Sequence, residues 1–289
     1  MKILVIGANG QLGKSVQKIV SSAKQNNEFV FVGRGELDLS QEESIASYLN
    51  NNKFDIIINC AAYTAVDKAE EEQELANQVN YLAVKQLAEI ANKQQAKLIH
   101  ISTDYVFSGK TDKPYIETDK TNPINIYGKT KLAGEKAIQA IMPTNAVIIR
   151  ASWVYSEYSN NFVNTMLRLG KERDELSVVN DQMGSPTYAT DLANVILKII
   201  VDRGYQAKDR ATEVYHYSNK GKISWYDFAK EIFKIAEVGC KVSPIMTEQY
   251  PAPAKRPRNT SMSKNKIAET FSVNIDDWRV GITRHLSVF

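Results

Sequence analysis

Tyr127 and Lys131 lie four positions apart in the segment NIYGKTK, where a helical pattern over 127–141 begins. Because one helical turn separates them, the phenol hydroxyl and the ammonium project from the same face and can act on one ligand. A nearby cation favours the phenolate, which lowers the pKa of a phenol from about 10 toward neutral pH. We therefore predict that Tyr127 is a proton donor whose acidity is set by Lys131.

A tyrosine and a lysine at this spacing are common on ordinary helices, so the surrounding chain must support the assignment. The apolar run KLIHIS over 97–102 predicts a buried strand, and Thr103 and Asp104 follow it directly. In parallel sheets covered by helices, the carboxyl ends of the strands face the ligand crevice. We therefore expect Thr103 and Asp104 to lie beside Tyr127.

Short β-branched runs alternate with longer amphipathic stretches over the first 150 residues. The runs are apolar throughout, which indicates strands that helices cover on both faces. This pattern predicts an α/β fold with a Rossmann-type, doubly wound parallel sheet. The expected strands cover 2–6, 29–32, 55–59, 97–102 and 146–150, and the expected helices cover 11–24, 41–51, 75–94 and 127–141.

A glycine-rich loop, GANGQLG, joins the first expected strand to the first expected helix. Its glycines permit a tight turn, a close approach of backbone N–H groups to a pyrophosphate, and close packing of the helix on the strand. Three glycines alone often arise by chance, but their place between a strand and a helix indicates a dinucleotide site. We assign to cofactor binding the residues Gly7, Gly10, Gln11, Leu12 and Gly13.

The end of the second strand bears on the choice of nicotinamide cofactor. An acid there binds the ribose 2′-hydroxyl, whereas an arginine accepts a 2′-phosphate. This strand ends in Gly33-Arg34-Gly35, with no acid at the tip. The alternative, that Arg34 is a solvated turn residue, carries equal weight. The hypothesis is a preference for NADPH, with NADH as the other candidate cofactor.

Two further segments border the expected cofactor path. After the third strand, the small residues Ala61 and Ala62, followed by Tyr63, let a cofactor pass across the sheet. A simple core position is the alternative for Ala61 and Ala62. Lys131 can also donate hydrogen bonds to the hydroxyls of a nicotinamide ribose, which would fix the cofactor beside Tyr127.

Beyond Arg150 the alternation weakens, and the remaining chain predicts a smaller C-terminal substrate-binding domain that is interleaved with the first. We place the NADP(H)-binding Rossmann domain at 1–152, completed by about 187–221, and the substrate-binding domain at 153–289. The expected elements are helices over 161–172 and 191–202, strands over 176–180 and 213–218, and a helix from Ser224.

Composition argues against several kinds of partner. Charged residues make up 24% and hydrophobic residues 43% of the chain, and the formal net charge is only +3. This balance favours a small ligand over nucleic acid or a membrane surface. Because the chain runs straight into KILVIG and has no apolar stretch of bilayer length, we expect a cytoplasmic protein. The histidines lack metal-ligand spacing and receive no role; they are His100, His216 and His285.

Segments spread over nearly the whole chain resemble the dTDP-4-dehydrorhamnose reductases, a family of the extended short-chain dehydrogenase/reductases. The glycine spacing G-x-x-G-x-x-G matches the extended group. The other segments come in the family's order, which is far more specific than any single motif. They are NCAAYTAVDKAE, ISTDYVFSG, INIYGKTKLAGE, RASWVY, NNFVNTM, DQMGSPTYATDLA and KRPRNTSM.

The resemblance implies that a nicotinamide hydride reduces the C4 ketone of dTDP-4-dehydro-L-rhamnose to give dTDP-L-rhamnose for cell-surface polysaccharides. It implies that Tyr127 protonates the developing alkoxide, that Thr103 hydrogen-bonds the same oxygen, and that Lys131 tunes the tyrosine and holds the ribose. Asp104 and Trp153 map onto positions that contact the sugar, and Trp153 would offer it a flat apolar face. The alternatives are a turn residue for Asp104 and a buried aromatic residue for Trp153.

The same resemblance bears on the adenine end of the cofactor and on a metal ion. It places Asp38 and Leu39 along the adenine. Some members of the family bind magnesium through glutamates at a dimer interface, but here Ser15 stands where the first-helix glutamate would be expected. We therefore predict no metal, and a monomer and a homodimer both stay open.

Two other functions compete with the reductase. A sugar-nucleotide epimerase or 4,6-dehydratase shares the fold and the Tyr/Lys pair, but the dehydratases follow the threonine with an Asp-Glu pair, whereas Thr103 is followed by Asp104 and Tyr105. A non-catalytic regulatory subunit, such as that of methionine adenosyltransferase, also resembles these reductases. The presence of Thr103, Tyr127 and Lys131 argues against that alternative.

Overall fold

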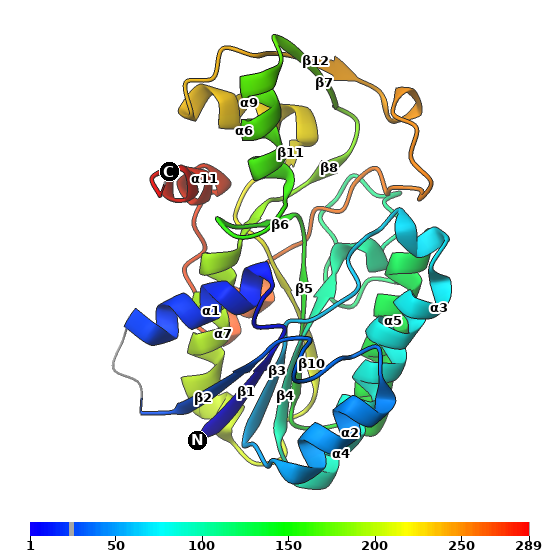
Figure 1. Cartoon of the computed structure of the whole chain (residues 1–289), viewed down its shortest axis with the longest axis vertical. Coiled ribbons are helices and arrows are strands. Elements are labelled where there is room, and N and C mark those ends of the chain that lie inside the picture. Colours follow the sequence, from blue (N-terminus) through cyan, green and yellow to red (C-terminus); the bar gives the residue numbers. More distant parts are fainter. Residues whose placement is uncertain (23–25, 289) are drawn as a thin grey trace.

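Six parallel strands form the central sheet in the order β10-β5-β4-β3-β1-β2 (Figure 1). The computed structural model describes residues 1–22 and 26–288. Strand β1 lies between β2 and β3. The chain passes from β1 to β2 on one side and then crosses to β3 on the other side, which creates a topological switch point at the carboxyl end of β1. The predicted Rossmann-type, doubly wound sheet is confirmed. Its strands are β1 (Lys2–Ile6), β2 (Glu28–Val32), β3 (Ile56–Asn59), β4 (Lys97–Thr103), β5 (Ala146–Ala151) and β10 (Glu213–Tyr217).

The strands are mostly apolar because both faces of the sheet are buried. In β1, Ile3 and Val5 face one hydrophobic core, and Leu4 and Ile6 face the other. Successive strand residues point to opposite faces, so a fully apolar run fits a strand between two layers of helices.

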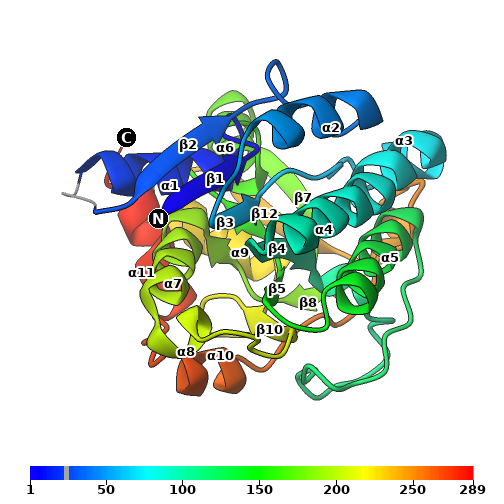
Figure 2. The same ribbon diagram turned by 90° about the horizontal axis from the view of Figure 1, so that it is seen from below.

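Helices cover the sheet on both sides (Figure 2). On one side lie α1 (Gln11–Ser22) and α7 (Ala189–Val201), and on the other lie α2 (Glu42–Asn51), α4 (Ala83–Gln94) and α5 (Ile126–Ile141). The helix expected over 11–24 is present as far as Ser22, and its positions 23 and 24 lie outside the described residues.

The helix expected over 75–94 is divided into three parts: α3 (Gln73–Asn77), a π-helical turn (Gln78–Leu82) and α4. The π turn brings the backbone close to α5, since a Cβ on Gly134 would lie 2.4 Å from the carbonyl oxygen of Asn80. Asn80 is fully buried and donates to the carbonyl of Tyr63 at 3.0 Å. The turn thus holds the segment that follows β3, which borders the cofactor path predicted from the sequence.

A smaller unit stands over the carboxyl ends of the strands (Figure 1). Its core joins three helices and several two-stranded sheets and is rich in aromatic residues. Strands β7 and β12 pair in parallel. Neither β12 nor α11 was predicted from the sequence. The elements are α6 (Phe162–Glu172), α9 (Trp225–Ile235), α11 (Trp278–Leu286), β6 (Val154–Tyr155), β7 (Glu175–Val179), β8 (Met183–Gly184), β9 (Thr187–Tyr188), β11 (Ile223–Ser224) and β12 (Lys241–Ile245).

Late segments of the chain return to the first core. Strand β10 pairs with β5, α7 packs on the α1 side of the sheet, and α8 (Arg203–Gln206) and α10 (Asn265–Thr270) add Tyr205 and Ile267 to the same core. No helix within the described residues is both long and apolar enough to cross a membrane.

Candidate active site

A cavity of about 910 Å³ opens at the carboxyl ends of β1, β3 and β4, between the sheet and the smaller unit. Its size is in the upper part of the range of small-molecule sites, roughly 300–1,000 Å³. Every predicted site residue except Gly13 lines it. These are Gly7, Gly10, Gln11, Leu12, Arg34, Asp38, Leu39, Ala61, Ala62, Tyr63, Thr103, Asp104, Tyr127, Lys131 and Trp153.

The glycine loop forms a cradle that side chains would fill. Gly7 has a φ of 85°, and a Cβ there would lie 2.8 Å from the backbone nitrogen of Ala61. A Cβ on Gly13 would lie 2.2 Å from the carbonyl oxygen of Gly7, so Gly13 brings α1 onto the loop and does not face the cavity. The amino end of α1 therefore opens into the cavity beside a bare backbone, which fits the pyrophosphate of a dinucleotide.

Gln11 connects this cradle to the smaller unit. Its side-chain carbonyl accepts hydrogen bonds from Ser156 Oγ at 3.1 Å and Asn161 Nδ2 at 3.0 Å. Its Nε2 donates to the carbonyl of Val154 at 3.4 Å. The first turn of α1 is thus anchored to both sides of the cavity.

At the tip of β2, Arg34 is already paired with a carboxylate. Its Nε donates to Asp38 Oδ2 at 3.1 Å, and its side chain is 76% exposed. Partial burial acts to raise the pKa of Asp38, but hydrogen bonds from Ser40 and Arg34 outweigh it and hold that pKa below its usual value. Arg34 therefore lies at the rim of the cavity with Asp38 as its partner.

The floor below β3 is held by side-chain amides. Ala61 donates its backbone N–H to Asn59 Oδ1 at 3.0 Å, and Tyr63 donates its N–H to Asn80 Oδ1 at 2.9 Å. The Tyr63 hydroxyl donates to Glu72 at 2.6 Å. These bonds orient the backbone of Ala61 and Tyr63 along the cavity.

Helix α5 begins against the end of β4. Asn125 caps it by accepting from the Gly128 N–H at 2.8 Å, which satisfies one of the free donors of the first turn. A Cβ on Gly128 would lie 2.2 Å from the carbonyl oxygen of Tyr105. This close contact carries Tyr127 to the end of β4, where Thr103 and Asp104 lie.

Thr103 connects its two neighbours in the site. It donates to Asp104 Oδ1 at 3.1 Å and accepts from the Tyr105 N–H at 3.2 Å. Burial raises the pKa of Tyr127 to about 12, and a hydrogen bond with Thr103 opposes this rise. The sequence led us to expect a Tyr127 pKa lowered by Lys131, but burial raises this pKa and the opposing contribution comes from Thr103. Burial also raises the pKa of Asp104, to about 6.

Lys131 is buried beneath this group, and its partners are neutral. Its Nζ donates to the carbonyl of Ile101 at 2.7 Å and lies 3.3 Å from His100 Nε2. Burial lowers the pKa of Lys131 to about 8. The sequence interpretation gave His100 no role, although a single histidine inside the apolar run KLIHIS was a usable signal.

Trp153 lines the cavity with a φ of 48°. Its indole stacks on that of Trp225, with ring centroids 3.5 Å apart and an interplanar angle of 12°. Trp225 also lines the cavity and was missed by the sequence interpretation. One face of Trp153 is therefore covered, and the two indoles together form an aromatic wall.

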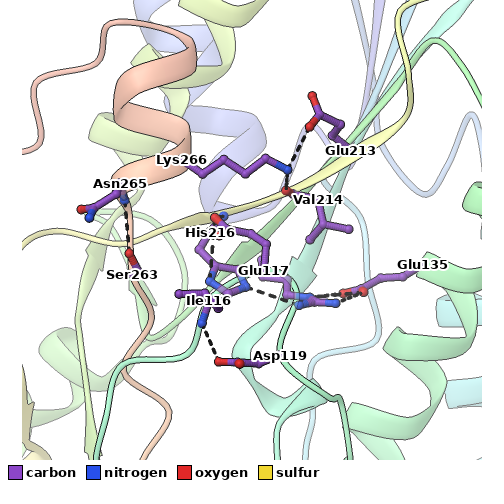
Figure 3. Close-up of polar contacts among 11 residues, drawn as sticks. Ile116, Glu117, Asp119, Glu135, Glu213, Val214, His216, Ser263, Asn265 and Lys266 are labelled. Carbon is purple, nitrogen blue, oxygen red and sulfur yellow. Dashed lines mark hydrogen bonds and ion pairs between the residues drawn. The ribbon is translucent and has the colours of Figure 1, made fainter.

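A second buried polar group lies one turn further along α5. Arg150 of β5 binds the Glu135 carboxylate through two nitrogens, at 2.7 Å from Nη2 and at 3.0 and 3.2 Å from Nε. Arg150 Nη1 also lies 3.3 Å from His216 Nε2, and His216 donates its backbone N–H to Glu117 at 3.0 Å. Figure 3 shows Glu135, His216 and Glu117 of this network.

A glycine cradle at a switch point and a Tyr/Lys pair beside a strand-end threonine define the class: a Rossmann-type member of the extended short-chain dehydrogenase/reductases. The chain matches the family model described as RmlD substrate binding domain over residues 1–289. It is 42% identical over 294 residues to the dTDP-4-dehydrorhamnose reductase of Escherichia coli (strain K12), across 99% of this chain and 97% of that protein.

Two crystal structures are similar over 100% of this chain and 99% of theirs. One is a dTDP-4-dehydrorhamnose reductase from Clostridium acetobutylicum ATCC 824, with a TM-score of 0.92 and 40% identity. The other is the dTDP-4-dehydrorhamnose reductase of Bacillus anthracis str. Ames in complex with NADP, with a TM-score of 0.91 and 38% identity. The chain belongs to the RmlD substrate-binding domain family, which confirms the resemblance drawn from its segments.

Proposed function

We propose that this protein is a dTDP-4-dehydrorhamnose reductase, an oxidoreductase that uses NADPH to convert dTDP-4-dehydro-L-rhamnose into dTDP-L-rhamnose. The observation that carries the proposal is one cavity that joins the glycine cradle to Tyr127, Lys131 and Thr103. Relatives about 40% identical over almost the whole chain carry this name.

A bound nicotinamide cofactor supplies the hydride to the C4 carbon of the sugar. Tyr127 donates its phenolic proton to the oxygen, which gains negative charge in the transition state. Thr103 hydrogen-bonds the same oxygen and fixes its position. A phenol with a pKa of about 12 keeps its proton until that oxygen becomes the stronger base, which suits a donor in a reduction.

The other predicted residues position the two ligands. The amino end of α1, with Gly7, Gly10, Gln11 and Leu12, receives the pyrophosphate, and Gly13 packs behind it. Asp104 and the Trp153 side of the aromatic wall contact the sugar. The remaining cofactor contacts are assigned to Arg34, Asp38, Leu39, Ala61, Ala62, Tyr63 and Lys131.

The domain bounds, location and assembly stay predictions: a cofactor domain at 1–152 completed by about 187–221, an interleaved substrate domain at 153–289, a cytoplasmic monomer or homodimer, and no metal. The pairing of β10 with β5 supports the completion of the first domain by a late segment. Within the described residues no group of three His, Cys, Asp or Glu side chains is placed to hold a metal ion.

One assay separates the candidate functions. Purified protein is mixed with NADPH and dTDP-4-dehydro-L-rhamnose, and the loss of reduced nicotinamide is followed. Stoichiometric oxidation with formation of dTDP-L-rhamnose supports the reductase. Tight NADPH binding without turnover would instead favour a regulatory subunit, and conversion of a sugar nucleotide with no net loss of NADPH would favour an epimerase or dehydratase.

Tyr127→Phe tests the proposed proton donor. The variant keeps the ring but lacks the phenolic proton, so we expect turnover to fall roughly 10²–10⁴-fold. NADPH binding, followed by its fluorescence, should change little. Turnover near the wild-type rate would remove Tyr127 from the acid role.

A further inference from the structure

A row of buried polar groups leads from Lys131 to the cofactor side of the sheet. Asn59, the last residue of β3, and His100, in the middle of β4, are register partners, and both are 0% exposed. His100 Nε2 lies 3.3 Å from Lys131 Nζ, and His100 Nδ1 lies 3.2 Å from Asn59 Nδ2. Asn59 Oδ1 in turn accepts from the Ala61 N–H at 3.0 Å. The row therefore connects Lys131 to the cavity floor.

The chemistry of these groups sets the direction of each bond. A backbone N–H can only donate, so Asn59 must turn its oxygen to Ala61 and its NH₂ to His100. Because an amide NH₂ also only donates, His100 Nδ1 must be the acceptor. The proton of a neutral imidazole then sits on Nε2 and points at Lys131 Nζ.

This pattern is complete only with a neutral amine at Lys131. A neutral Nζ can accept from His100 Nε2–H through its lone pair and still donate to the Ile101 carbonyl at 2.7 Å. An ammonium has no lone pair and would set donor against donor. The mismatch is relieved only if the imidazole changes tautomer and the Asn59 amide rotates, which breaks its bond to Ala61.

We propose that Asn59 and His100 are positioning residues that lock the imidazole in its Nε2–H form, favour the neutral amine of Lys131, and couple its protonation to the cofactor side of the sheet. The proposal rests on the proposed function, because Lys131 belongs to the same Tyr/Lys pair. It makes Lys131 a group that loses and regains a proton in the working pH range.

The surrounding charges are compatible with this lock. Burial lowers the pKa of Lys131 to about 8, and Glu135 of the same helix acts in the opposite direction. The Glu135 carboxylate, however, is bound by Arg150 of β5. Burial and Lys131 lower the pKa of His100 well below its usual value, so the ring is neutral.

Two acids that line the cavity also stay neutral in the working pH range. Burial raises the pKa of Cys60 to about 12 and that of Tyr127 to about 12.

Nuclear magnetic resonance of the whole protein labelled with ¹⁵N-histidine reads the tautomer directly, because protonated and unprotonated ring nitrogens differ widely in chemical shift. The chain has three histidines, and the His100 signals are those missing from His100→Gln. At high pH we expect a protonated Nε2 and an unprotonated Nδ1. Both His100 shifts should then change with a midpoint near pH 8, where Lys131 titrates. A proton on Nδ1 at high pH, or shifts that stay constant from about pH 6 to 10, would overturn the proposal.

Asn59→Asp reverses the lock with little change of shape. A carboxylate accepts from Nδ1–H, so Nε2 turns its lone pair to Lys131 and favours the ammonium. We expect the Lys131 midpoint to move up by about one pH unit or more. It is followed in the His100 shifts and in the pH dependence of NADPH affinity.

Asn80→Asp is the matched control, since Asn80 is also 0% exposed and its side chain hydrogen-bonds to Tyr63 and Thr130. Its midpoint should stay near the wild-type value. Equal shifts in the two variants would assign the effect to added charge and overturn the lock. If Asn59→Asp does not fold, the wild-type resonances decide. A wild-type protein that shows the titration and binds NADPH without turnover would contradict the proposed function only.

Discussion

Two buried cations lie against the same helix, and they are satisfied in opposite ways. Arg150 of β5 makes a bidentate ion pair with Glu135 of α5, and both side chains are almost fully buried. Lys131, one turn earlier on α5, meets a carbonyl and a neutral imidazole. Arg150 reaches α5 from β5, where it is the register partner of Ser102 of β4. Lys131 belongs to α5 itself and meets His100 of β4, the register partner of Asn59 of β3.

The difference separates a structural charge from a functional one. A buried ion pair with good geometry keeps both charges through the working pH range. A buried cation without a carboxylate partner has a lowered pKa, because removal from water disfavours its charged form. The pKa of Lys131 falls to about 8 for that reason. Shifted pKa values of this kind concentrate at functional sites. We therefore expect the Arg150 end to hold α5 on the sheet and the Lys131 end to act in the proposed reaction.

The largest expected effect comes from breaking the structural pair. Glu135→Gln leaves the Arg150 guanidinium buried without a counter-charge, which costs about 3–5 kcal/mol of unfolding free energy. Urea denaturation at neutral pH measures the loss.

Glu89→Gln is the control, because Glu89 forms an exposed pair with Lys85 on α4. Exposed pairs contribute about 0.2–1 kcal/mol, so this variant should lie close to the wild type. Equal losses of unfolding free energy in the two variants would show that the buried pair is no more stabilising than the exposed pair, which would contradict the structural role of Arg150 and Glu135.

Lys131→Met should have the opposite profile. It removes a buried cation that has no carboxylate partner among the described residues, so we expect the unfolding free energy at neutral pH to be unchanged or higher. Turnover should fall by about a hundredfold or more. Denaturation and the NADPH assay on the same preparation measure both. A large loss of stability with normal turnover would place Lys131 with the structural charges.

The pH dependence of the unfolding free energy gives a second test of Lys131→Met. Lys131 has a pKa of about 8 in the folded protein, below the value of about 10.4 in an unfolded chain. The unfolded state therefore binds more protons between these values, and wild-type stability gains from a rise in pH through this window. Lys131→Met lacks this contribution. The difference between the two proteins should shift in favour of the wild type as pH rises from about 8 to about 10.

The fold was largely predictable because local patterns determine it. Fully apolar runs such as that of β1 indicate strands buried on both faces, and the glycine loop marks the first crossover. Strand β12 escaped prediction because KVSPI contains Pro244, which argues against a strand, although an edge strand paired only with β7 tolerates it. Helix α11 was missed because it is only nine residues long and contains Gly281.

The sequence predicted the placement of those site residues that lie at the carboxyl ends of strands. Thr103 is the last residue of β4 and Asp104 follows it, and the carboxyl ends of parallel strands meet at one edge. His100 and Asn59 were missed because their meaning depends on the register between β3 and β4, which one sequence does not display. Trp225 was missed for a similar reason, since it reaches Trp153 from another part of the chain.

The smallest expected effect concerns Arg34, a third kind of cation that is paired but exposed. Its bond to Asp38 is open to water, so the guanidinium can exchange that partner for a ribose 2′-phosphate at little cost. Arg34→Ala should lower the ratio of NADPH to NADH affinity by roughly two- to fivefold, the range of a single exposed ion pair. Fluorescence titrations with both cofactors measure the ratio, and the drop should shrink at high salt. An unchanged ratio would show that Arg34 is a solvated turn residue and that the preference arises elsewhere in the cavity.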